Sequence, residues 1–277
     1  MPVDTPEEQI SQDSVATYVP PLDSQPEPQP APWGLQDLVF FLLFAPLALV
    51  IANLIALAGY SVLRALLIRG NLSDSLQHDT FFLLAFQLIF QGLLLGFVYA
   101  LVVFHHRRPF WSGLNWRKPS LGQTIWLALG GVVLAFAIQW VPNILPETRT
   151  FPLQQMFTSP AAGYAIGAYS ILMAPWAEEV IFRGFLFGVF ERRAGLWFAI
   201  GVTALLFGGL HVPEYWGAWN HVILISLVGL TFSLARGLTG SLAPSVILHL
   251  AYNTSLIAGL YFQTQGFQNI KRARKTE

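Results

Sequence analysis

The chain has 277 residues, of which 54% are hydrophobic and only 11% are charged, and its formal net charge at pH 7 is zero. Because a soluble domain carries about 25% charged residues, this composition indicates an integral membrane protein rather than a soluble globule. The neutral balance gives no basis for a nucleic-acid partner, and the absence of cysteine excludes thiol catalysis, thiolate metal ligands and disulfides.

Residues 1–33 differ in composition from everything that follows. They contain eight prolines and six acidic residues, and they lack Lys and Arg. Such a stretch has too little apolar surface to fold, so we expect a disordered, acidic, Pro-rich tail. A secretory signal peptide begins with basic residues and has a short apolar core. Here the first apolar run is long and follows an acidic segment, so we expect it to be retained as a span.

Seven long apolar segments follow this tail. A helix needs about 20 apolar residues to cross a bilayer, and an open sheet cannot cross because lipid offers its backbone no hydrogen-bond partner. The alternation of barrel strands is missing. We therefore expect an all-α, polytopic transmembrane helical bundle of about seven spans with a central polar cavity. The expected spans are residues 35–63, 80–104, 121–141, 161–190, 195–211, 220–236 and 242–262.

These segments suggest two membrane regions and a second tail. Residues 34–141 form an N-terminal three-helix region, residues 160–262 a second membrane domain, and residues 263–277 a basic C-terminal tail. Basic residues at 105–118 and at 192–193 belong in the cytoplasm by the positive-inside rule. Seven spans then place the C-terminal basic residues outside, against the rule. Either an eighth helix is hidden in a split segment, or one segment does not cross; the sequence leaves both open.

The fourth segment carries three charged residues in an apolar setting, Glu178, Glu179 and Arg183. A charge at mid-bilayer costs about 2.5–3.5 kcal/mol on insertion scales, so these groups are expected to serve a purpose. Residues four apart share a helix face, whereas neighbours are about 100° apart. Glu179 and Arg183 can therefore pair, and Glu178 is left to contact water. In the alternative interpretation all three form a buried ionic cluster that locks helices together. Pro175 is expected to kink this helix.

Two histidine motifs follow on later segments. His249 and Asn253 are four residues apart and can project from one helix face, and His211 ends a different span. A carboxylate can act as general base on water, a histidine can move the proton, and His or Asn can donate to a developing oxyanion. These groups suffice for hydrolysis without a serine or cysteine nucleophile. We give no chemical role to His221 or to His105–His106, which is interpreted as a membrane-edge anchor.

The three patterns together resemble the CPBP family of membrane proteases, also called the CAAX protease and bacteriocin-processing or Abi family, which includes the Rce1-type prenyl-protein endopeptidases. That family is marked by EExxxR, FxxxH and HxxxN/D motifs on successive membrane helices. Here they stand as Glu178-Glu179-Val-Ile-Phe-Arg183, Phe207-Gly-Gly-Leu-His211 and His249-Leu-Ala-Tyr-Asn253. The resemblance covers roughly residues 160–262, which would be the catalytic membrane domain.

The resemblance implies an intramembrane endopeptidase that hydrolyses a peptide bond of a membrane-associated protein or peptide. It also implies multi-pass insertion, with the bilayer as surroundings and a bacterial plasma membrane as location. No cofactor or metal is expected. The implied roles are Glu178 as activator of water with help from His211, His249 and Asn253 as oxyanion stabilisers, and Glu179, Arg183 and Phe207 as supporting residues.

Two alternatives stay open at this point. A Glu/His set could hold zinc with one open position, giving a zinc-dependent membrane protease. Glu178 and His211 lack the compact spacing of a single-helix zinc motif, which favours metal-free catalysis. A non-enzymatic membrane scaffold or regulator of the same fold could keep the polar cluster for packing alone. A proton-coupled transporter is disfavoured because the carboxylates are confined to one segment.

Overall fold

A computed structural model of the chain describes residues 32–67, 79–140 and 152–269. Most of the expected N-terminal tail and the last eight residues lie outside these ranges, so the disorder of the tail stays a prediction. Trp33, the last residue assigned to that tail, is fully buried. Phe267, inside the expected C-terminal tail, is also buried. Each tail therefore includes, next to the helices, a residue that packs into the bundle.

Every regular element in the described ranges is a helix, so the all-α prediction is confirmed. Two of the elements, η2 and η4, are π-helical turns continuous with α-helices. The elements are α1 (Leu35–Leu67), α2 (Thr80–Ala100), η2 (Leu101–His105), α3 (Phe110–Gly113), α4 (Leu121–Trp140), α5 (Pro152–Met156), α6 (Pro160–Leu172), α7 (Ala174–Glu179), η4 (Val180–Leu186), α8 (Phe187–Ala194), α9 (Leu196–Leu210), α10 (Trp219–Thr239) and α11 (Leu242–Gln263).

Five described helices are long and apolar enough to cross a membrane, and they match the first, second, third, sixth and seventh expected spans. They are Leu35–Leu63, Thr80–His105, Leu121–Trp140, Trp219–Thr239 and Leu242–Gln263. The expected count of seven or eight spans is not confirmed. The fifth expected span, residues 195–211, becomes α9 with only 15 residues. The fourth, residues 161–190, is not one helix.

The fourth segment is divided because of Pro175. Proline lacks an amide hydrogen and its ring clashes with the carbonyl one turn earlier, so a continuous helix is disfavoured there. Helix α6 ends at Leu172, and Pro175 lies in the first turn of α7. Helix α7 continues directly into η4, whose wider turn rotates the following side chains relative to an α-helix. The two glutamates end α7, and Arg183 lies in η4.

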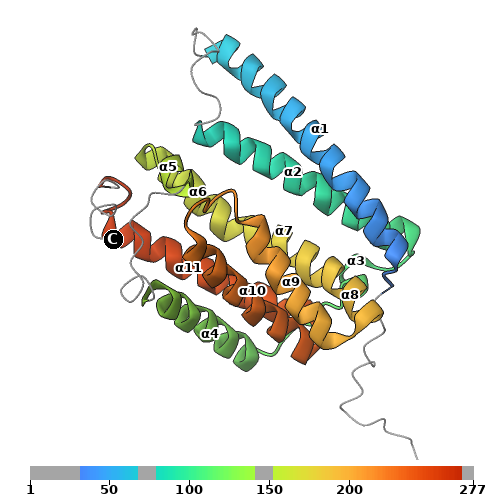
Figure 1. Cartoon of the computed structure of the whole chain (residues 1–277). Coiled ribbons are helices and arrows are strands. Elements are labelled where there is room, and N and C mark those ends of the chain that lie inside the picture. Colours follow the sequence, from blue (N-terminus) through green and yellow to red (C-terminus); the bar gives the residue numbers. More distant parts are fainter. Residues whose placement is uncertain (1–31, 68–78, 141–151, 270–277) are drawn as a thin grey trace, which may run out of the picture.

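The segment formed by α7 and η4 lies in the middle of the bundle. Figure 1 shows α1 and α2 along one edge, and α4, α10 and α11 on the other side. Together, α7 and η4 contact α2 on one side and α9, α10 and α11 on the other. Because the acidic motif lies on this central segment, its side chains can meet groups from both halves of the protein.

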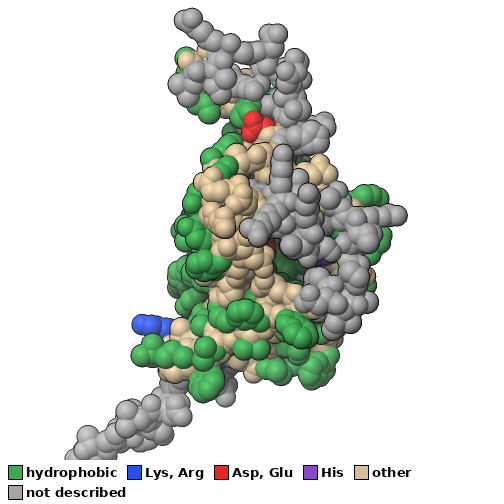
Figure 2. Space-filling view, turned by 90° about the vertical axis from the view of Figure 1, so that its left-hand side faces the viewer, with side chains coloured by type: hydrophobic (Ala, Val, Ile, Leu, Met, Phe, Trp, Pro, Cys, Tyr) green, Lys and Arg blue, Asp and Glu red, His purple; other side chains and the backbone are tan. Residues whose placement is uncertain are grey.

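The outer surface is apolar, as a membrane protein requires. Large side chains such as Leu43, Leu66 and Trp126 remain two-thirds or more exposed. In Figure 2 hydrophobic side chains spread over the described surface, and charged groups are sparse. Apolar exposure on this scale indicates contact with lipid. The chain is an integral membrane protein.

A close contact between α4 and α11 sets the position of the His249 motif. A Cβ added to Gly131 would lie 2.5 Å from the Leu248 carbonyl oxygen and 2.8 Å from the Ala251 Cβ. We expect Gly131→Ala to destabilise the protein by about 1–3 kcal/mol, because the backbones must separate. Gly122→Ala, also in α4 but with no atom within 4 Å of its Cβ, is the matched control. Thermal unfolding in detergent measures both, and equal melting temperatures would contradict this account.

Candidate active site

The Glu179–Arg183 pair forms the buried part of the candidate site. The Arg183 Nη1 donates to the Glu179 Oε1 at 3.0 Å, and both side chains are fully buried. Arg183 also donates from Nε to the Ser233 Oγ at 3.2 Å and from Nη2 to the Gly229 carbonyl at 2.6 Å, both on α10. The Phe207 ring centroid lies 4.6 Å from its guanidinium carbon. All three kinds of guanidinium nitrogen are thus satisfied, which is what a buried charge requires.

His249 connects this pair to the second glutamate. Its Nδ1 is 2.9 Å from the Glu179 Oε1, and its Nε2 is 3.8 Å from the Glu178 Oε2. The Phe232 ring stacks on the imidazole with centroids 4.6 Å apart. Because a carboxylate only accepts hydrogen bonds, the Nδ1 is the donor to Glu179. Helix α11 therefore presents the His249 Nε2 toward Glu178.

The two adjacent glutamates have different environments. The Glu179 side chain is completely buried and accepts from both Arg183 and His249, whereas the Glu178 side chain is 18% exposed. The Glu178 carboxylate has no partner closer than the His249 nitrogen at 3.8 Å among the described residues. One carboxylate is therefore bound in place, and its neighbour is available to a water molecule or a substrate.

His211 is the first residue after α9, and its ring is held by its own helix. The His211 Nδ1 lies 2.7 Å from the Phe207 carbonyl oxygen. A carbonyl only accepts, so the Nδ1 is the donor, and the Nε2 is the ring nitrogen left for another partner. The Phe207 ring lies 4.8 Å from the His211 ring and 5.9 Å from the His249 ring. Phe207 thus separates the two imidazoles and supports both.

Asn253 lies one turn beyond His249 on α11. Its Nδ2 donates to the Ser170 carbonyl on α6 at 2.8 Å, and the residue is half-buried. Within the described ranges, no hydrogen bond joins Asn253 or His211 directly to Glu178. The second amide hydrogen and the oxygen of Asn253 remain available to a bound group. Glu179 thus contacts Arg183 and His249 directly, whereas His211 and Asn253 lie at the edge of this network.

Glu214 is a titratable neighbour of this site that the motifs do not reveal. It lies in the connection between α9 and α10, three residues after His211, and keeps an exposed surface. It is close enough to His211 and Glu178 to interact electrostatically with both. An acidic residue one turn after the motif histidine was the available signal in the sequence.

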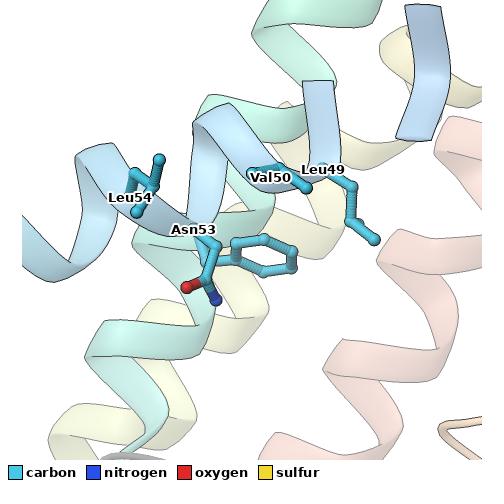
Figure 3. A pocket seen from close by; sticks show the side chains of 5 residues that line it. Leu49, Val50, Asn53 and Leu54 are labelled. Atoms are coloured by element: carbon cyan, nitrogen blue, oxygen red, sulfur yellow. The ribbon is translucent and has the colours of Figure 1, made fainter. Parts of the chain in front are cut away.

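A separate groove of about 330 Å³ is lined by residues of α1 and by Phe86 of α2. Figure 3 shows its lining, in which Asn53 carries the polar group among apolar side chains. The other lining residues are Leu49, Val50, Leu54 and Phe86. It contains none of the motif residues, so it is not the candidate active site.

Comparison with known proteins supports the resemblance. Residues 160–255 match the family described as "Type II CAAX prenyl endopeptidase Rce1-like". The chain is 25% identical over 150 residues to the Bacillus subtilis (strain 168) protein named "Putative membrane peptidase YdiL", covering 52% of this chain and 59% of that protein. The resemblance inferred from the three motifs is therefore confirmed for this region, at low identity.

Two further relatives match part of the chain. The "Uncharacterized 24.3 kDa protein" of Escherichia coli is 30% identical over 145 residues, covering 49% of this chain and 66% of that protein. The "Apolipoprotein N-acyltransferase" of Bordetella bronchiseptica (strain ATCC BAA-588 / NCTC 13252 / RB50) is 31% identical over 105 residues, covering 38% of this chain and 17% of that protein. The chain thus spans less than two thirds of each of these relatives. No solved structure matches the chain.

Proposed function

We propose that the chain is an intramembrane endopeptidase in which Glu178 activates the attacking water. The match of residues 160–255 to prenyl endopeptidases supports peptide-bond hydrolysis as the class of reaction. The observation that carries the finer proposal is the contrast between adjacent carboxylates. The Glu179 Oε1 accepts from both Arg183 and His249, whereas Glu178 is partly exposed and faces the His249 Nε2 at 3.8 Å.

In the proposed reaction, Glu178 removes a proton from water as its oxygen attacks the carbonyl carbon of the scissile bond. The carbonyl oxygen becomes an oxyanion, which needs hydrogen-bond donors. His249 donates from Nδ1 to Glu179, and its Nε2, when it carries a proton, donates to this oxygen. Asn253 offers its second amide hydrogen. The proton then passes to the leaving amine as the carbon–nitrogen bond breaks, with the His211 Nε2 as an acceptor and relay.

The substrate is proposed to be a membrane-associated protein or peptide. The test compares peptide termini, by mass spectrometry, in membranes that carry the wild-type chain and in membranes that carry Glu178→Gln. We expect a small set of termini that depend on Glu178 and are restored by the wild-type chain. Identical sets of termini would instead support a non-enzymatic scaffold.

Asn253 offers a prediction that separates oxyanion binding from packing. Asn253→Ala is expected to reduce cleavage by about 10²-fold, since loss of one oxyanion donor typically costs 10²–10³ in kcat. Thr254→Ala, the next residue along α11, is the matched control because its hydroxyl bonds its own helix at the Leu250 carbonyl and is exposed. Cleavage rates per molecule of folded protein measure the effect; equal rates in both variants would remove Asn253 from the reaction.

A further inference from the structure

Three metal-ligating side chains meet at the edge of the bundle, away from the three motifs. Asp37 lies in the first turn of α1, His105 ends η2, and His106 follows it. One ligand atom from each lies within 4.8 Å of the others. The sequence gives no hint of this cluster, because Asp37 precedes the histidine pair by almost seventy residues.

The Asp37 carboxylate is buried and already oriented. It is 2% exposed, its Oδ2 accepts from the Gly34 amide at 2.7 Å, and its Oδ1 lies 3.0 Å from the His106 Nε2. The Gly34 hydrogen bond is of the kind that orients metal ligands, and an ion would take the place of the proton between the Asp37 Oδ1 and the His106 Nε2. Ligands about 2.0 Å from a tetrahedral ion are about 3.3 Å apart, so the Asp37–His106 pair is close to ligand spacing without an ion.

The π-helical turn brings the neighbouring histidine to the same place. The His106 amide donates to the Leu101 carbonyl, five residues earlier, at 2.9 Å. Isolated π-turns occur frequently at functional sites. The rings of His105 and His106 have centroids 4.7 Å apart. His105 is exposed, so the cluster is open to solvent on that side, and water can complete the coordination.

We propose that Asp37, His105 and His106 bind a divalent transition-metal ion, with zinc as the best match. Two imidazole nitrogens and one carboxylate oxygen suit zinc and its neighbours, whereas magnesium and calcium favour sites made of oxygen alone. The ion would fix the start of α1 to the end of η2. Trp33 extends this contact to η4, because its ring packs on His106 at 5.5 Å and on Phe185 at 5.1 Å. The site is independent of the proposed hydrolysis.

The test uses the full chain in detergent, purified without a histidine tag. Zinc bound after equilibrium dialysis is measured by mass spectrometry, with excess magnesium present. The decisive variant is His105→Ala, because it leaves the Asp37–His106 hydrogen bond intact. We expect wild type to retain one zinc ion per chain and His105→Ala to bind at least tenfold more weakly. Asp37→Asn and His106→Ala should bind more weakly still, and His221→Ala should bind like wild type.

The melting temperature separates binding from folding. Without zinc, His105→Ala should have the same melting temperature as wild type. Added zinc should raise the melting temperature of wild type and His221→Ala only. Glu178→Gln distinguishes this site from the motif residues: retained zinc in that variant supports the proposal. Zinc lost with Glu178→Gln but kept in His105→Ala, or zinc absent from wild type, would overturn it. None of these readouts depends on proteolysis.

Discussion

Replacing Glu178 by Gln is expected to lower the cleavage rate about 10²–10⁴-fold while the protein stays at its normal abundance. General acid–base catalysis typically contributes this factor, and the amide has the same shape but cannot accept the proton of water. Glu178 is 18% exposed and makes no hydrogen bond that holds the helices together in the described chain, so folding should be spared. The measurement is the cleavage rate in membranes, divided by the amount of folded protein.

The adjacent residue provides the sharpest comparison. Glu179→Gln removes the charge that pairs with Arg183, so it should lower abundance and melting temperature, unlike Glu178→Gln. Glu191→Gln, on α8, is the control for removing a carboxylate elsewhere in the bundle; it should cleave normally. Full cleavage by Glu178→Gln would refute the assignment of the general base. A loss of cleavage fully accounted for by lower abundance would do the same.

Hydropathy predicted the positions of the helices that are long enough to cross the membrane. The first, second, third, sixth and seventh expected spans begin and end within a few residues of long helices, because a bilayer demands a continuous apolar run. Pro175 indicated a kink in the fourth expected span, and the structure has a break there, before Ala174, but the π-turn of η4 that follows had no signal in the sequence. Composition does not register where a backbone changes its hydrogen-bond pattern.

In the candidate site, contacts between residues close in the sequence were predictable, whereas contacts between distant residues were not. The contact of Glu179 with Arg183 follows from helical spacing, since the two are four residues apart. The contact of His249 with Glu179 joins residues 70 positions apart, and only the packing of α11 on α7 creates it. The position of Asn253 against the Ser170 carbonyl is equally non-local. Helical spacing predicted the Glu179–Arg183 contact, but the sequence did not predict that His249 contacts Glu179, or which nitrogen of each histidine faces which partner.

Arg183→Met is expected to destabilise the protein by about 3–5 kcal/mol and to reduce its abundance in membranes. The substitution keeps an apolar chain of similar length but strands the fully buried Glu179 carboxylate. Removing one partner of a buried pair carries this cost because the other charge stays desolvated. The Gly229 carbonyl and the Ser233 hydroxyl lose their donor as well. Thermal unfolding in detergent and immunoblots of membranes measure the two effects.

A double variant and a second arginine test the cause. Adding Glu179→Gln to Arg183→Met should recover part of the stability, because the stranded charge is removed and His249 can still donate to the amide oxygen. Arg236→Met should cost less, about 1–3 kcal/mol, because the buried Arg236 donates to the Arg183 carbonyl and has no carboxylate within ion-pairing distance in the described ranges. Normal abundance of Arg183→Met with lost cleavage would instead place Arg183 in the reaction. Arg183 also packs against the Phe207 ring, which contacts both imidazoles. A loss of packing at Arg183 should therefore change the positions of His211 and His249 together.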